Sequence, residues 1–322
     1  MRYIFAFLAC LLPLSALAST SHEVMEETMT KMEQLALNKP QEANPAPAPT
    51  PAVKQPAPQT TSFEPRKRLL HASLGYDLSY MHYRETSDGD TLDKDYGFMH
   101  GLYINLGYKS DVDFEFDING KEIVLGKPFI EGYYRRADHH LTYDGSTLGG
   151  TPLKHPQHSF VQNFGIKAGL SRNLTEKGEV YAYVDGGRRI WQRGENRTID
   201  GAYEYAEKYV WLYAGGGIGA TYRPIPKFSS GIDIEGLIGV QPKMHSDLYE
   251  GATFQLGSVS GVEVKLPLKY YMLQNLSWDL TPYYSFWRIK RSDPAVISGV
   301  SYQEPDSRTH VLALQTGLTY CF

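Results

Sequence analysis

Cysteine is almost absent from this sequence, which limits what can stabilise the fold. Cys10 and Cys321 are the only two in 322 residues. Cys10 lies in the apolar segment that opens the chain, so once that segment is removed Cys321 has no partner for an intramolecular disulfide. Lipidation of Cys10 is disfavoured because Phe7-Leu8-Ala9 is a poor lipidation signal. The stability of the mature chain must therefore come from something other than disulfides.

A long apolar run and an excess of positive charge are also missing. No stretch reaches the roughly 20 apolar residues of a transmembrane helix. The 32 Lys and Arg residues against 36 Asp and Glu residues give a net charge of −4, which argues against a nucleic-acid partner. The short apolar run that is present follows Arg2 and ends in Ala16-Leu17-Ala18. This order is typical of a secretory signal peptide over residues 1–18, so export is predicted.

Two segments with no alternating pattern follow the signal peptide. Residues 19–39 carry Met25, Met29 and Met32 on one side of a short amphipathic helix pattern. Residues 40–65 are rich in proline and alanine, which favours an extended spacer of roughly 60 Å at about 3.1 Å per residue. We expect this arm to lie in the periplasm. It is either a mobile tail or a peptide that binds a periplasmic or cell-wall partner.

From about residue 66 the polarity of the sequence alternates with a period of two. The apolar series Leu102, Ile104, Leu106 and Tyr108, for example, is interleaved with small and polar residues. Similar alternation runs through 232–241 and 262–269. Segments that are half apolar and half polar fit either a soluble sheet or a membrane barrel whose apolar face contacts lipid. The alternation alone leaves both open.

The last residues, HVLALQTGLTYCF, favour the membrane barrel. Phe322, Tyr320 and Leu318 share one face of a strand, with Thr319 and Gly317 on the other. This ending resembles the closing strand of bacterial outer-membrane β-barrel proteins. The resemblance implies an all-β fold over 66–322, a transmembrane antiparallel up-and-down β-barrel in the outer membrane of a Gram-negative cell. It also implies that Tyr320 and Phe322 form an assembly signal for the barrel assembly machinery.

Turn and loop residues divide residues 66–322 into about ten strands. They are expected near 69–83, 98–118, 121–143, 158–172, 178–193, 205–222, 228–245, 254–270, 276–291 and 307–322. Short connections alternate with longer polar ones at 84–96, 144–157, 194–204, 246–253 and 292–306, as in barrels with short periplasmic turns and long outer loops. Counts of eight or twelve strands are left open because strand boundaries are the weakest part of the prediction.

The stretch SDVDFEFDING at 110–120 allows two interpretations. Its alternating carboxylates resemble part of a calcium loop. A loop that places Gly120 at the sixth position, however, puts Gly126 where a bidentate carboxylate is needed. The apolar residues Val112, Phe114, Phe116 and Ile118 instead continue the series of the preceding strand up to Asn119-Gly120, a favoured hairpin turn. A strand with Phe114 facing lipid is predicted, and no metal.

The same alternation assigns charged side chains to the lumen of the barrel. Ten strands leave a narrow interior that side chains can fill. Because both signs of charge are present, the residues predict either a salt-bridged plug or a narrow path for ions or small solutes. The predicted lumen charges are Glu131, Arg135, Lys167, Asp185, Arg189, Asp233, Glu235, Glu263, Lys265 and Asp279.

Four basic residues fall on the outward face near the outer ends of strands: Arg136, Arg188, Arg288 and Lys290. Charge is tolerated on that face only near the membrane interface. There it would meet outer-membrane lipid, and above all the phosphates of lipopolysaccharide. Alternatively, these side chains project above the membrane, or a bulge at Gly186-Gly187 reverses the alternation.

Ten strands also resemble the omptins, outer-membrane proteases with an Asp pair facing an Asp-His pair on the rim. His245 and Asp247 lie where that family has Asp-x-His, but in reversed order, and the second loop offers Asp138 and His139 in place of Asp-x-Asp. These departures put proteolysis in doubt. No other catalytic motif is present, and no cofactor is expected.

The sequence therefore predicts a non-enzymatic integral outer-membrane barrel. Its role would be structural, adhesive or that of a narrow pore, with a charged and largely side-chain-filled lumen. The alternative is a rim-active outer-membrane enzyme, either an omptin-like protease or a lipid-modifying enzyme.

Overall fold

The computed structural model describes residues 69–322 except 120, 148, 200, 249–250 and 298. The signal peptide, the amphipathic helix, the proline-rich linker and the basic cluster at 66–68 lie outside the described residues. Within the described residues every regular element is a β-strand. None of them contains a helix that is long and apolar enough to cross a membrane.

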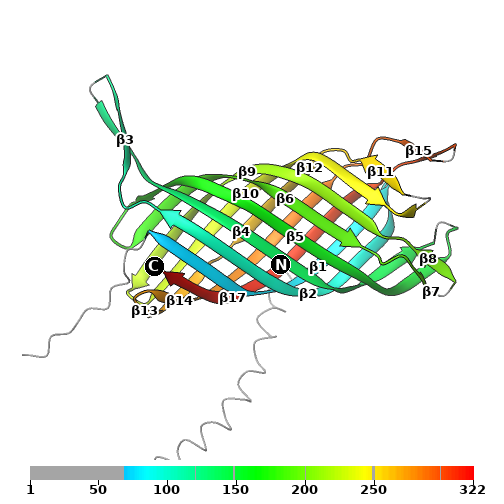
Figure 1. Ribbon diagram of the computed structural model, residues 1–322, viewed down its shortest axis with the longest axis horizontal. Helices are drawn as coiled ribbons and strands as arrows, with labels where there is room; N and C mark the ends of the chain where they lie inside the picture. Colours follow the sequence, from blue (N-terminus) through cyan, green and yellow to red (C-terminus); the bar gives the residue numbers. More distant parts are fainter. Residues whose placement is uncertain (1–68, 120, 148, 200, 249–250, 298) are drawn as a thin grey trace, which may run out of the picture. The chain divides into compact units, whose positions relative to one another are not determined.

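Ten antiparallel strands close into one barrel (Figure 1). The barrel closes because the first strand pairs with the last, from His71 opposite Cys321 to Thr86 opposite Asp306. Closure gives every strand two neighbours and leaves no open edge in the wall. In chain order the strands are β1 (Leu70–Ser87), β2 (Asp90–Lys109), β4 (Lys121–Ser146), β5 (Pro152–Asn173), β6 (Gly178–Arg193), β9 (Glu207–Ile225), β10 (Phe228–Ser246), a strand split into β11 (Ala252–Gln255), β12 (Val259–Lys265) and β13 (Leu268–Leu273), then β14 (Leu276–Ile289) and β17 (Asp306–Cys321).

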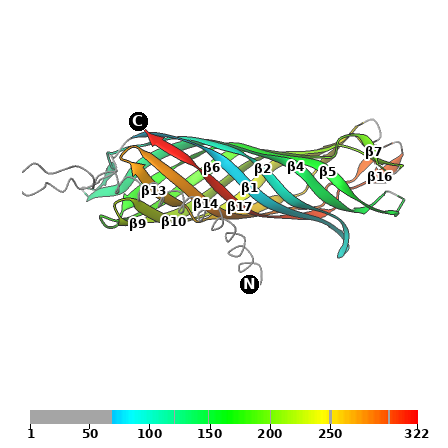
Figure 2. The same cartoon turned by 90° about the horizontal axis from the view of Figure 1, so that it is seen from below.

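The two ends of the barrel differ. The end that carries the chain terminus Phe322 also has the tight turns at 174–177, 226–227 and 274–275. The other end carries two small hairpins, β7 (Arg197–Ile199) with β8 (Ala202–Glu204) and β15 (Ala295–Ile297) with β16 (Val300–Tyr302) (Figures 1 and 2). Barrels of the outer membrane keep short turns in the periplasm and longer connections outside. We therefore name these the periplasmic end and the outer end.

The prediction of a first outer loop over 84–96 is wrong. β1 and β2 continue through this segment and meet in a two-residue turn at Asp88-Gly89, where φ is 52° and 98°. Positive φ at both central residues is the hairpin turn that Asp-Gly favours. The segment is polar because it extends beyond the lipid, where both faces of a strand tolerate polar side chains. Polarity was therefore a poor guide to a loop here.

The predicted strand over 98–118 is also only partly right. Its barrel portion ends at Lys109, and β3 (Phe114–Ile118) pairs only with the first residues of β4, as a hairpin that stands off the periplasmic end (Figure 1). The strand interpretation of this stretch is confirmed against the calcium loop. β3 pairs with no described barrel strand other than β4, however, and all five of its residues are exposed, so Phe114 does not belong to the lipid-facing wall.

This difference gives a direct comparison of two apolar positions. Ile104 faces outward near the middle of the lipid-facing part of β2, whereas Phe114 is on the projecting hairpin. Ile104→Lys should lower the unfolding free energy in bilayers by about 2–4 kcal/mol, because a charge near the membrane midplane loses its hydration. Phe114→Lys should change it by less than about 0.5 kcal/mol. Urea unfolding in lipid vesicles measures both, and an equal loss would place Phe114 in the wall.

Candidate functional site

The outer half of the lumen is filled by large apolar and aromatic side chains. Trp191 stacks on Tyr209 with 4.7 Å between ring centroids, and Trp211 lies 5.8 Å from Trp287. All four rings are buried and occupy inward positions. On β6, for example, the neighbours of Trp191, Ile190 and Gln192, face outward. We call this layer the apolar plug. It also includes Met81, Tyr83, Met99, Leu141, Met244, Phe254, Leu256, Val259 and Ile289.

A buried arginine surrounded by acids lies beside the plug toward the outer end. Arg193 contacts Glu85 at 2.9 Å, Asp93 at 3.1 Å, Asp95 at 3.3 Å and Glu207 at 3.4 Å. Its guanidinium also lies 5.0 Å from the centre of the Tyr83 ring. One cation therefore joins side chains of β1, β2 and β9 across the lumen. Removing it would leave several buried carboxylates without a counter-charge, which is costly.

Three carboxylates of this region have the spacing of a cation site. Oxygens of Glu85, Glu207 and Glu304 all lie within 4.8 Å of one another. Oxygen ligands of this kind suit calcium or magnesium. The hydroxyls of Tyr83 and Tyr209 already donate hydrogen bonds to Glu85 and Glu304. The trio is thus hydrogen-bonded within the protein, and its spacing alone does not assign an ion.

The periplasmic half of the lumen contains a chamber of about 420 Å³. Its lining runs from Trp287 and Arg189 in mid-barrel to His71 and Lys269 next to the periplasmic turns. A second cavity of about 30 Å³ lies between the chamber and the plug, bordered by Asp77, Met81 and Asn163 among others. A volume of that size holds about two water molecules, and Met81 and Met99 of the plug border it.

Glycines in β9 leave room for the tyrosines that line this chamber. A Cβ atom on Gly217 would stand 2.4 Å from the Tyr183 ring, and one on Gly219 would stand 2.2 Å from the Tyr181 ring. Both distances are impossible for a real side chain, so the rings can lie against the wall only where glycine exposes the backbone. The run GGGIGA in the sequence thus keeps the chamber open.

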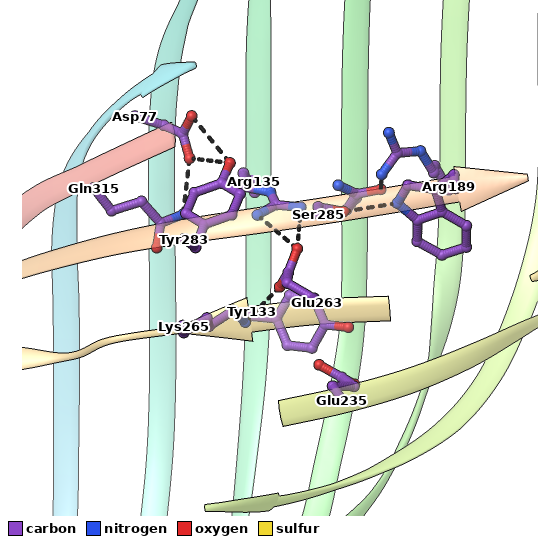
Figure 3. Close-up of polar contacts among 12 residues, drawn as sticks. Asp77, Tyr133, Arg135, Arg189, Glu235, Glu263, Lys265, Tyr283, Ser285 and Gln315 are labelled. Carbon is purple, nitrogen blue, oxygen red and sulfur yellow. Dashed lines mark hydrogen bonds and ion pairs between the residues drawn. The ribbon is translucent and has the colours of Figure 1, made fainter. Parts of the chain in front are cut away.

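The chamber charges form paired networks (Figure 3). Glu263 accepts from Arg135 at 3.3 Å and from Lys265 at 2.7 Å. Asp77, which is fully buried, accepts from Tyr283 at 3.0 Å and Gln315 at 2.8 Å. Such pairing is what charges withdrawn from bulk water require.

A second network contains Lys167. Its ammonium donates to Glu235 at 2.7 Å and to the Tyr183 hydroxyl at 3.1 Å, while Tyr133 donates to Asp185 at 2.7 Å. Glu235 Oε1 and Asp185 Oδ1 have no partner in the protein.

The sequence-predicted lumen charges are placed as follows. Nine of them line the chamber, namely Glu131, Arg135, Lys167, Asp185, Arg189, Asp233, Glu235, Glu263 and Lys265. Asp279 contacts Lys269 at 3.7 Å, and that lysine is part of the lining. These charges surround the chamber, whereas apolar side chains close the lumen.

The outward face of the barrel is apolar around its whole circumference. Large side chains stand exposed on every strand, such as Leu74 at 61% and Val184 at 67%. On β2 the exposed aromatic rings of Phe98 and Tyr108 are ten residues apart (108 − 98). That spacing is about 33 Å along the strand and about 25 Å along the membrane normal at a 40° tilt, the height of the lipid band between two aromatic girdles. This is a transmembrane β-barrel of the outer-membrane type.

Solved outer-membrane barrels are similar to it in fold. The outer membrane protease OmpT from Escherichia coli matches with 10% identity over 82% of this chain and 99% of its own, at a TM-score of 0.48. The attachment invasion locus protein Ail of Yersinia pestis, solved with the heparin analogue sucrose octasulfate, matches with 11% identity over 78% and 99%, at 0.32. OprG from Pseudomonas aeruginosa matches with 9% identity over 81% and 99%, at 0.33. No protein-family model and no curated protein matches the sequence.

The four candidate catalytic residues fall into two groups with separate hydrogen-bond partners. Asp138 accepts from Arg136 at 2.9 Å and contacts His158 at 2.7 Å, whereas His139 is exposed with its ring 5.0 Å from that of His100. On the other rim segment, His245 Nδ1 contacts the Thr253 hydroxyl at 2.8 Å, and Asp247 accepts from Asn196 at 2.7 Å. Among the described residues, no hydrogen bond or ion pair joins the two groups.

The four outward basic residues fall into two kinds. Arg136 pairs with Asp138, and Lys290 lies 3.7 Å from Asp306. Arg188 and Arg288 have no carboxylate partner in the part of the chain described here. The bulge considered at Gly186-Gly187 is absent, because β6 stays in register with β5 throughout. Arg188 therefore faces outward and Arg189 inward.

Sequence reasoning missed the Arg193 cluster. The signal for Arg193 was present, since it continues the inward series of Asp185 and Arg189 on β6. Its partners were hidden because Asp93 and Asp95 were assigned to a loop. Once β1 and β2 are extended to Asp88-Gly89, alternation turns both aspartates inward.

The cluster predicts a pH dependence of stability. Burial, and then the charges of Glu207 and Asp93, raise the pKa of Glu304 to about 8, against the opposing effects of Tyr209 and Arg193. A carboxyl whose folded pKa exceeds its usual value of about 4.5 stabilises the fold fully below that value and loses this contribution as pH rises through 8. The barrel should therefore unfold more readily at pH 9 than at pH 5.

Glu304→Gln should weaken this dependence, on the order of a few kcal/mol, because the amide does not ionise whereas the neighbouring buried carboxyls still do. Tryptophan fluorescence during thermal unfolding at pH 5, 7 and 9 measures it. Glu176→Gln, at an exposed periplasmic turn, is the matched control and should keep the wild-type pH profile. An unchanged profile in Glu304→Gln would show that Glu304 ionises normally.

Proposed function

We propose that this protein is a non-conducting integral protein of the outer membrane with a structural or adhesive role at the cell surface. The observation that carries the proposal is the apolar plug. A path for ions needs polar side chains or room for water along its whole length, and the outer half of the lumen offers a packed aromatic and aliphatic layer instead. This argues against the narrow-pore version of the prediction.

The fold leaves the outer end as the part able to meet other molecules outside the cell. There the hairpins β7–β8 and β15–β16 extend beyond the apolar band. Tyr203 on β8 is 57% exposed, and Val296 on β15 is 74% exposed. Exposed aromatic and aliphatic side chains on short hairpins are suited to contacts with a surface or a protein. A rim enzyme has less support, because its candidate residues are not joined in one site.

The periplasmic side of the proposal rests on sequence alone. The signal peptide at 1–18 would direct export, and the arm over 19–65 would bind a periplasmic or cell-wall partner. The last strand supports recognition by the barrel assembly machinery. Tyr320 and Phe322 are exposed, and the Phe322 amide donates to Leu70 O at 3.0 Å. The terminal residue thus takes part in closing the barrel.

Planar-bilayer recordings test the closed lumen. The wild-type barrel should give no discrete conductance steps in 1 M salt, because the plug leaves no continuous water path. The variant Trp191→Ala/Trp211→Ala/Trp287→Ala removes three inward rings and should conduct. Trp278→Ala is the matched control, since this tryptophan faces outward and is 44% exposed; it should remain silent.

Heat-modifiability on gels shows that each variant is folded before it is recorded. Steady steps from the wild-type protein would contradict the proposal. So would a folded triple variant that stays as silent as Trp278→Ala, because the rings would then not be what closes the lumen.

A further inference from the structure

Four cations stand side by side on the outward face of neighbouring strands near the outer end. Cross-strand pairing places Arg84 opposite Lys94 on β2 and opposite Arg308 on β17, and it places Arg308 opposite Arg288 on β14. The inward neighbours Tyr83, Glu85 and Ser307 are buried, so alternation turns these four side chains out. We call Lys94, Arg84, Arg308 and Arg288 the cation row. Only Arg288 was singled out from the sequence.

The row is not neutralised by ion pairs within the described residues. None of its four members forms an ion pair with a carboxylate there. Asp144 stands opposite Lys94, but its ion pair is with Lys154 at 3.5 Å. At the other end Arg288 faces Ser260. Like charges directly opposite on a sheet are destabilising, and here three such pairs follow one another.

Below the row lie two rows that define its height. The next outward row consists of Tyr96, His82, His310 and Phe286, and the one beneath it of Phe98, Tyr80, Leu312 and Tyr284. The lower row is the outer aromatic girdle. Arg84 lies four residues beyond Tyr80, which is about 13 Å along the strand and about 10 Å along the membrane normal. Headgroups begin at the edge of the hydrocarbon core and extend roughly 5–8 Å beyond it, so flexible arginine side chains reach them.

We propose that the cation row binds the phosphate groups of a phosphorylated lipid in the outer leaflet. Phosphate oxygens accept the paired N–H groups of arginine in a bidentate manner. Two neighbouring arginines and their flanking cations would share one anionic headgroup, which relieves the repulsion along the row. The acyl chains of the same lipid would then lie along the aromatic and aliphatic rows below.

A lipid fits this surface better than a protein or a free anion. The row lies above the aromatic and aliphatic wall, with the row that contains His82 and His310 between them, and this order of charged, polar and apolar groups matches the amphiphilic shape of a lipid. The inference rests on the outer-membrane placement of the barrel and is independent of whether its lumen conducts.

The test compares lipid binding by the full-length barrel and two charge-matched variants. Arg84→Gln/Arg308→Gln removes the centre of the row. Lys208→Gln/Lys243→Gln removes two outward cations on β9 and β10, away from it. Native mass spectrometry or titration in detergent would use three probes, namely bisphosphorylated lipid A, dephosphorylated lipid A and inorganic phosphate.

The wild-type barrel should bind bisphosphorylated lipid A at least about tenfold more tightly than the dephosphorylated form, with affinity falling as salt is raised. The row variant should lose about tenfold or more in affinity, and the control variant less than about twofold. Equal affinity for the two lipid forms, equal binding by the two variants, or inorganic phosphate binding as tightly as the lipid would overturn the proposal.

The difference in stability between the row variant and the wild type gives a second readout. Its sign should change when bisphosphorylated lipid A is added. Without lipid A the row variant should be as stable as the wild type or more stable, because like-charge repulsion is reduced. With bisphosphorylated lipid A present the wild type should become the more stable of the two. A row variant that is less stable in both conditions would show that the row serves the fold and not a lipid.

Discussion

Because the wall of this protein is a closed pleated sheet, each of its side chains faces either the lipid or the lumen. Successive residues point to opposite faces, and closure between β1 and β17 leaves no edge at which that rule relaxes. The outward face must be apolar to contact lipid, and the inward face must fill or line a narrow lumen. The adjacent residues Arg188 and Arg189 show the consequence, since the first faces out and the second lies buried over the Trp287 ring.

The lumen divides into two parts because the inward positions change in character along the strands. Near the periplasmic end they supply carboxylates, lysines and tyrosines with glycine between them, which leaves a chamber lined by paired charges. Beyond Arg189 on β6 they supply Trp191 and then Arg193, so an aromatic layer is followed by a buried cation among acids. In the proposed closed lumen, apolar packing would exclude water from the outer half, and the resulting low dielectric would strengthen the ion pairs around Arg193.

The alternation of side chains along a strand also explains which features of the structure could be predicted from the sequence. Where the predicted strand boundaries were right, the alternation of apolar and polar residues alone predicted that Asp185, Arg189 and Glu263 point inward. It failed where the chain leaves the barrel wall, because β3 keeps the alternation yet has no lipid and no lumen on either side. It also failed over 84–96, where a polar strand above the membrane looks like a loop. Contacts between strands distant in sequence, such as those of Arg193 with Glu85, depend on strand stagger, which no local pattern encodes.

The central claim is that inward side chains close the outer half of the lumen and leave water only in the periplasmic half. A high-resolution crystal structure in which ordered water is located tests it most directly. The account predicts waters in the chamber around Lys167 and Glu235, about two beside Asp77 in the small cavity, and none between the rings of Trp191, Tyr209 and Trp211. A continuous column of water that joins the chamber to the outer end past these rings would contradict it.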